Sequence, residues 1–126
     1  MQHDGPQRDA AFGAAPQTII KAFKELYILS GAAAQFGCYG LEVVDSQWRA
    51  LIECTHDARA VAPREAACET EAFTAFGQLL AMCENIVGLH MSGHPCPPAM
   101  WREVARMGRD AYPYIYQRMA AQRGGA

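Results

Sequence analysis

The chain has few of the residues that build β-sheets and thick hydrophobic cores. Valine, isoleucine and threonine, which favour strands, are scarce beside alanine, the strongest helix former. Leucine, isoleucine, valine and phenylalanine together make up only 23 of the 126 residues. We therefore expect an all-α protein whose helices approach closely and whose core is modest, with methionine, tyrosine and tryptophan supplying further volume.

The sequence also lacks the motifs by which many enzymes are recognised. It contains no glycine-rich phosphate loop, no G-x-S-x-G and no H-E-x-x-H, and its carboxylates form no acid/base pair. The net charge is −2, which gives no global electrostatic case for binding nucleic acid. We predict that the protein is not an enzyme, that it holds no cofactor, and that nucleic acid is not its partner.

No targeting signal is visible, and no membrane span is expected. The N-terminus has neither a cationic start nor an apolar run. The most apolar segment, 72–91, contains Gln78, Glu84, Asn85 and His90, which oppose insertion into a bilayer. Five cysteines without regular spacing fit a reducing compartment better than a disulfide framework. These features together predict a cytoplasmic protein.

Helical periodicity divides the chain into four helices. Residues 1–16 are predicted to be a disordered tail and residues 17–123 a single helical domain. The helices are expected over about 17–39, 45–62, 64–91 and 98–123, with Gly40 ending the first and Pro113 kinking the last. Segment 41–44 fits extended chain or the first turn of the second helix equally well. We expect a small four-helix bundle-like domain with the long third helix at its centre.

The third helix carries the clearest architectural signal. Between residues 73 and 91 its apolar side chains cover an arc of roughly 200°, whereas an ordinary surface helix needs little more than about 100°. We expect this helix to carry more apolar surface than one chain buries, and hence the chain to form a homodimer. The predicted dimer interface consists of Leu79, Met82, Ile86 and Leu89.

Two cysteines and two histidines in the same region are the right residue types for a zinc site. They are Cys83, His90, His94 and Cys96, in the pattern C-x6-H-x3-H-x-C. This spacing differs from the usual paired ligands, and it equally fits a core cysteine followed by exposed loop residues. The main prediction therefore includes no metal, and a zinc-binding or cysteine-dependent protein using these residues is an alternative.

The last helix presents two candidate surfaces. Arg102, Arg106 and Arg109 share a face that suits an acidic partner or DNA, or that is simply solvated. Met100, Met107 and Tyr114 repeat every seven residues along its flank, and such residues are enriched at interfaces. We predict that these six residues bind a partner. A DNA-binding protein that uses the arginine face is a second alternative.

The main prediction is a small non-enzymatic regulatory protein that acts by binding another protein. Bacterial proteins of this size and style often sequester a transcription factor, as quorum-sensing anti-activators do, or escort a secreted partner. No residue here carries a specific resemblance to such a family. The sequence therefore predicts a class of activity and leaves the partner unidentified.

Overall fold

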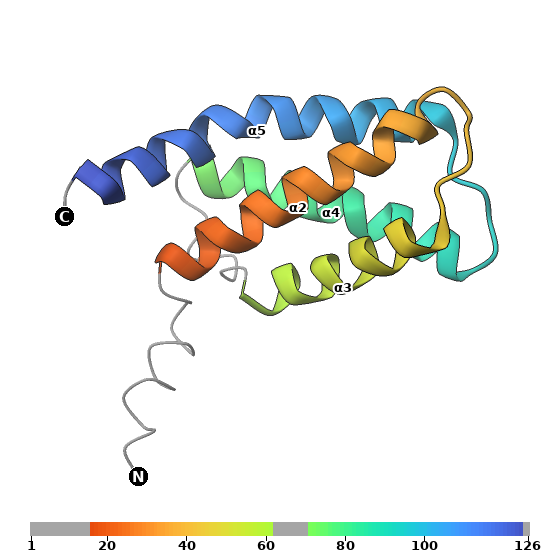
Figure 1. The fold of residues 1–126 in the computed structure, drawn as a ribbon, viewed down its shortest axis with the longest axis horizontal. Helices are drawn as coiled ribbons and strands as arrows, with labels where there is room; N and C mark the ends of the chain where they lie inside the picture. Colours follow the sequence, from red (N-terminus) through yellow and green to blue (C-terminus); the bar gives the residue numbers. More distant parts are fainter. Residues whose placement is uncertain (1–15, 62–70, 125–126) are drawn as a thin grey trace, which may run out of the picture.

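The structure is a computed structural model that describes residues 16–61 and 71–124. Its helices are α2 (Pro16–Gly37), α3 (Asp45–Val61), α4 (Glu71–Met91) and α5 (Pro98–Gly124). Successive helices run in opposite directions (Figure 1). No strand occurs in these two ranges, which confirms the prediction of an all-α protein with four helices. None of the described helices has the combination of length and apolarity that crossing a membrane requires.

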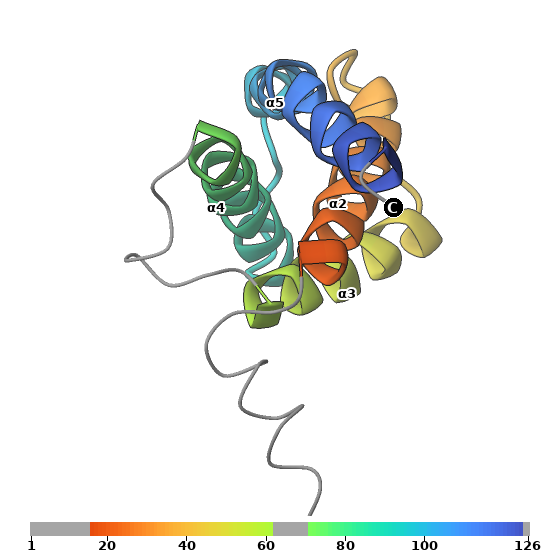
Figure 2. The ribbon, with the colours of Figure 1, turned by 90° about the vertical axis from the view of Figure 1, so that its left-hand side faces the viewer.

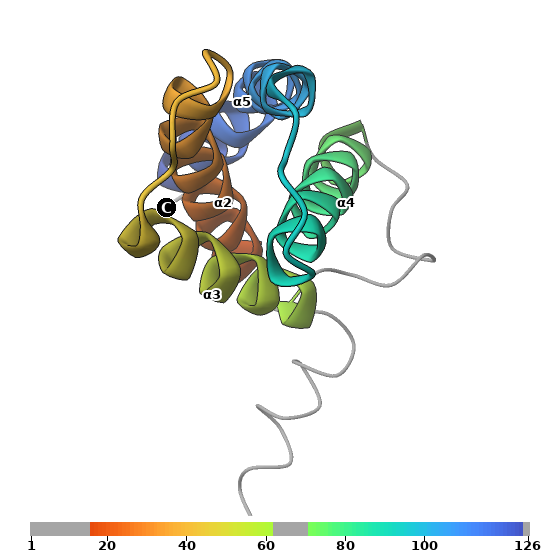
Figure 3. The same cartoon turned by 90° about the vertical axis from the view of Figure 1, so that its right-hand side faces the viewer.

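Seen end-on, the four helices occupy the corners of a bundle (Figure 2). Helix α2 packs between α3 and α5, and α4 packs against the same two helices from the diagonal corner. The connections 38–44 and 92–97 lie at the same end of the bundle (Figure 3). This is the up-and-down arrangement expected of helices joined by short loops.

Two helices end in the same way, at a glycine. Gly40 has a φ of 77° and Gly93 a φ of 80°, in the left-handed region that favours glycine. The N–H of each glycine donates to the carbonyl three residues earlier, and the next N–H donates to the carbonyl five residues earlier. These bonds form Schellman motifs, so the predicted helix ends are confirmed. Segment 41–44 is not helical, and α3 begins at Asp45.

Helix α4 contributes the largest share of the fully buried side chains. Those on α4 are Phe76, Leu79, Leu80, Cys83 and Ile86. Phe76 stacks on Phe23 of α2 with 4.3 Å between the ring centroids. The third helix is therefore the main source of the core, as its wide apolar arc predicts.

The dimer interface predicted on this helix is wrong for two of its four residues. Leu79 and Ile86 have no exposed surface within a single chain, so a second copy cannot reach them. Met82 and Leu89 are half-buried, and Met82 packs against the core. The physical reason is that α2, α3 and α5 all contact α4 and cover most of its arc. Among the described large apolar side chains of α4, only Met91 is largely exposed.

Pro113 lies inside α5, which continues without interruption to its last turn. Proline removes one backbone hydrogen bond and crowds the preceding turn. Figure 1 shows α5 bending toward its dark-blue C-terminal part, in agreement with the predicted kink. At the other end of the chain, Pro16 begins α2, and the rest of the predicted tail lies outside the described residues. The predicted start of the third helix, 64–70, lies outside them too.

Candidate functional site

A groove of about 530 Å³ lies between α2 and α5. Most of its lining residues are small, among them Ser30, Gly31, Ala32, Ala34, Ala105 and Gly108. No atom lies within 4 Å of the position that a Cβ would take on Gly31, so the missing side chain leaves open space. The volume is within the range of about 300–1,000 Å³ that is typical of ligand pockets. We call this feature the α2–α5 groove.

Helices α2 and α5 approach closely because glycines of one helix face aromatic rings of the other. A methyl group on Gly37 would overlap the indole of Trp101. A Cβ on Gly108 would lie 2.9 Å from Cδ1 of Tyr27. Larger residues at these positions would push the helices apart. The groove is therefore held by a close, specific packing of the two helices on which it lies.

Exposed apolar side chains surround the groove. Ile28 of α2 and Tyr39 of the following connection line it and are 50% and 79% exposed. Tyr27 stacks on Tyr112 of α5 with 5.2 Å between the ring centroids, and the ring centroids of Tyr112 and Tyr116 are 6.4 Å apart. We call Tyr27, Tyr112 and Tyr116 the aromatic row. Because tyrosine is enriched at protein interfaces, the row extends the apolar surface of the groove along α5.

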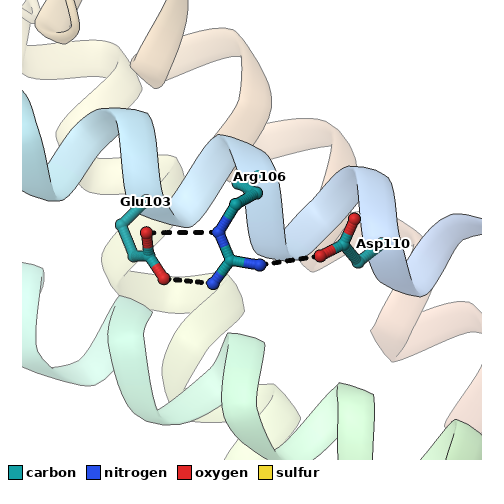
Figure 4. Close-up of polar contacts among 3 residues, drawn as sticks. All are labelled: Glu103, Arg106 and Asp110. Carbon is teal, nitrogen blue, oxygen red and sulfur yellow. Dashed lines mark hydrogen bonds and ion pairs between the residues drawn. The ribbon is translucent and has the colours of Figure 1, made fainter.

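The three predicted arginines have three different environments. Arg102 donates a hydrogen bond to the carbonyl of Cys38 at 3.1 Å. Arg106 pairs with Glu103 and, at 2.8 Å, with Asp110 (Figure 4). Arg109 lines the α2–α5 groove, is exposed, and has no ion-pair partner within the described ranges. Of the three arginines, Arg106 is therefore offset by carboxylates, Arg102 and Arg109 have no carboxylate partner within the described ranges, and only Arg109 lines the groove.

The methionines of the predicted α5 stripe belong partly to the core. Met100 and Met107 are half-buried and pack against the buried cluster. Tyr114 is also half-buried and interacts with a neighbouring residue. The sequence does not single out Tyr112 and Tyr116 as surface residues, because a helical period places them near the core and cannot show that their rings extend into solvent. The exposed apolar surface of α5 consequently lies closer to α2 than predicted.

The four residues of the predicted zinc alternative are not brought together. Cys83 is fully buried, and His90 stacks on Trp48 with 3.8 Å between ring centroids and 6° between the ring planes. His94 is exposed, and Cys96 is half-buried beside Pro97. Across residues 16–61 and 71–124, no three His, Cys, Asp or Glu side chains are arranged to hold a metal ion.

The buried thiols are poor nucleophiles. Burial raises the pKa of Cys54 and of Cys96 to about 11 and that of Cys83 to about 12. For Cys54, the nearby charges of Glu25 and Asp57 raise the pKa further. Since the thiolate is the reactive form, raised pKa values leave these three side chains protonated at neutral pH. This removes support from the alternative of a cysteine-dependent protein.

An ion pair joins α3 to α4 and gives a prediction for acid stability. Arg59 donates two hydrogen bonds to Glu84, at 2.8 and 2.7 Å. These bonds lower the pKa of the Glu84 carboxyl, against a smaller opposing effect of burial. A folded-state pKa below the unfolded value of about 4.3 means that the pair stabilises the fold above that pH. The stabilisation is lost as the pH falls through the lowered folded-state pKa.

We expect Glu84→Gln to lower the free energy of unfolding at pH 7 by less than about 1 kcal/mol, because both partners are partly exposed. The difference from the wild type should shrink as the pH falls from about 5 to about 3. Urea unfolding across this range measures it. Glu53→Gln, which removes a carboxylate without an ion-pair partner in the described ranges, is the matched control. A loss of unfolding free energy that does not depend on pH would contradict the role of the Arg59–Glu84 ion pair.

The α2–α5 groove can accept apolar side chains between its small residues and can place a negative charge beside Arg109. No protein-family model, curated protein or solved structure matches the chain.

Proposed function

We propose that this chain is a small non-enzymatic regulatory protein that binds an acidic amphipathic helix of a partner protein in the α2–α5 groove. Such a helix places apolar residues, spaced at i, i+3, i+4 and i+7, into a groove on its receptor. The observation that carries the proposal is that open space, exposed apolar side chains and an uncompensated cation occur together on one face. Gly31 leaves the space, Ile28 and Tyr39 border it, and Arg109 is the cation.

Affinity and specificity would come from different parts of this face. Covering Ile28 and Tyr39 removes apolar surface from water, at about 25 cal/mol for each Å² buried. The aromatic row adds tyrosines, which are among the residues that most often dominate binding energy. Arg109 favours a partner helix with a carboxylate at the matching position and steers its approach.

Binding of this kind regulates by occupancy. A partner helix held in the groove is hidden from the other molecules that it would contact. A transcription factor held in this way would be sequestered, and an aggregation-prone partner would be escorted. The same binding mode would serve both sequestration and escort, and the identity of the captured helix decides between them.

The first test identifies the occupant in the cell that produces the protein. A photo-cross-linking residue at position 28, on the rim of the groove, should form covalent adducts with one partner protein. The same residue at position 60, exposed on α3, is the control and should not. Mass spectrometry of the adduct should locate the cross-link in an acidic amphipathic helix. A cross-link to a second copy of this chain, or to a surface that is not helical, would contradict the proposal.

The second test fills the groove. Gly31→Leu should weaken binding of that helix at least about tenfold, since it places a side chain where the apolar face of the helix would lie. Gly77→Leu is the matched control, because Gly77 also has open space around it and does not line this groove. Calorimetry with the synthetic helix measures both. Equal affinity for the two variants would exclude the α2–α5 groove as the binding site.

A further inference from the structure

A second groove, of about 590 Å³, lies between α3 and α4 on another side of the bundle. Its apolar lining comes from Ile52, Val87 and Met91. Met91 is 69% exposed, and Val87 is almost fully buried. Gly88 lies between them in sequence and has no atom within 4 Å of the position of a Cβ. We call this feature the α3–α4 groove.

The charged residues of the α3–α4 groove are mostly acidic. Glu53, Asp57 and Glu84 line it, together with His56 and Arg59. Glu84 is neutralised by its two hydrogen bonds from Arg59. Glu53 and Asp57 have no ion-pair partner among the residues that the structure describes. Two uncompensated carboxylates therefore border an apolar floor.

A buried hydroxyl in the same lining lacks a hydrogen-bond partner. Thr55 is only 4% exposed, and its Oγ1 makes no hydrogen bond to any of the described residues. Buried polar groups are nearly always hydrogen-bonded, because an unsatisfied one costs free energy. Thr55 lies on α3 between Glu53 and Asp57 in sequence and lines the groove. Its oxygen has almost no accessible surface, so it lies beneath the groove and a ligand in the groove does not contact it.

We infer that the α3–α4 groove binds a small amphiphilic cation, an ammonium or guanidinium group on an apolar body. The apolar body lies over Val87 and the open space at Gly88. The cationic head lies against Glu53 and Asp57, which are four residues apart on one exposed face of α3. The volume is that of a site for a small molecule. This site is separate from the α2–α5 groove, whose only charged lining residue is the cation Arg109.

The test compares two probes with the same apolar body and opposite charge, hexylamine and hexanoate. Titrations followed by amide NMR spectra should show hexylamine binding about fivefold or more tightly than hexanoate, since each exposed carboxylate contributes modestly. The largest shifts should occur at residues 87 and 88. The double variant Glu53→Gln, Asp57→Asn should remove the preference for the amine. Equal binding of the two probes, or shifts confined to other helices, would overturn the inference.

Filling the groove tests the site without relying on charge. Gly88→Leu should remove detectable binding of hexylamine and leave the melting temperature at or above that of the wild type, because leucine favours a helix more than glycine does. Gly77→Leu should leave binding unchanged. Gly31→Leu should also leave binding of hexylamine unchanged. The proposed binding sites in the two grooves are therefore tested by different variants. Unchanged binding by Gly88→Leu would show that the amine lies elsewhere.

Discussion

Replacing Gly37 with alanine is expected to lower the free energy of unfolding by about 3 kcal/mol, the upper end of the usual cost of overpacking a core. The added methyl group would overlap the indole of Trp101, which is 3% exposed. The indole has little room to move, because it is buried and Trp48 packs against it with 5.5 Å between ring centroids. Relief therefore requires α2 and α5 to separate. Urea unfolding followed by circular dichroism measures the loss.

Gly31→Ala is the control in the same helix. Its methyl group would meet no neighbouring atom, and alanine favours the helix by up to about 1 kcal/mol over glycine. The two substitutions should therefore have opposite signs, although their chemistry is the same. Two stabilising substitutions would mean that α2 and α5 are packed more loosely than the structure shows. Two destabilising substitutions would mean that the α2–α5 groove is already filled.

Truncating Phe76 to alanine should lower the free energy of unfolding by about 3–5 kcal/mol, the usual range for a buried aromatic side chain. The ring is 1% exposed and stacks on Phe23, so its removal leaves a cavity and an unpartnered ring at the same place. With a chain this short, such a loss is a large part of the total stability. Thermal and urea unfolding should both show it.

The control for Phe76 is a phenylalanine on the surface. Phe36 of α2 is 42% exposed, and Phe36→Ala should lower the free energy of unfolding by about 1 kcal/mol or less. A comparable loss at both positions would show that Phe36 is covered in solution, for example by a second copy of the chain. A small loss at Phe76 would place the core elsewhere.

The helices and their ends could be predicted from the sequence because their causes are local. The apolar period defines each helix, and Gly40 and Gly93 adopt the left-handed conformation that ends one. The width of the apolar arc on α4 also correctly indicated a helix rich in buried side chains. It did not show how many neighbours cover that arc, because this depends on packing over long sequence distances. The apolar pattern alone therefore places Leu79 and Ile86 in a dimer interface, although the structure buries them.

The grooves could not be predicted for a related reason. Gly31 and Gly88 border open space, whereas Gly37 and Gly108 face aromatic rings, and all four lie in helices. Nothing local distinguishes them. The difference arises only when a second helix is placed alongside. The pairing of Arg106 is different, because Glu103 and Asp110 lie three and four residues away on the same helix, so the sequence spacing alone can separate Arg106 from Arg109.

The only two tryptophans of the chain, Trp48 and Trp101, lie together where the loops join the helices, with His90 stacked on the first. Tryptophan emission, excited at wavelengths that tyrosine does not absorb, therefore reports on this end of the bundle alone. The far end, where Phe23 stacks on Phe76, contains neither tryptophan and does not contribute to this emission. A fluorescence melting curve that departs from the loss of helical ellipticity would show that the two ends come apart in separate stages.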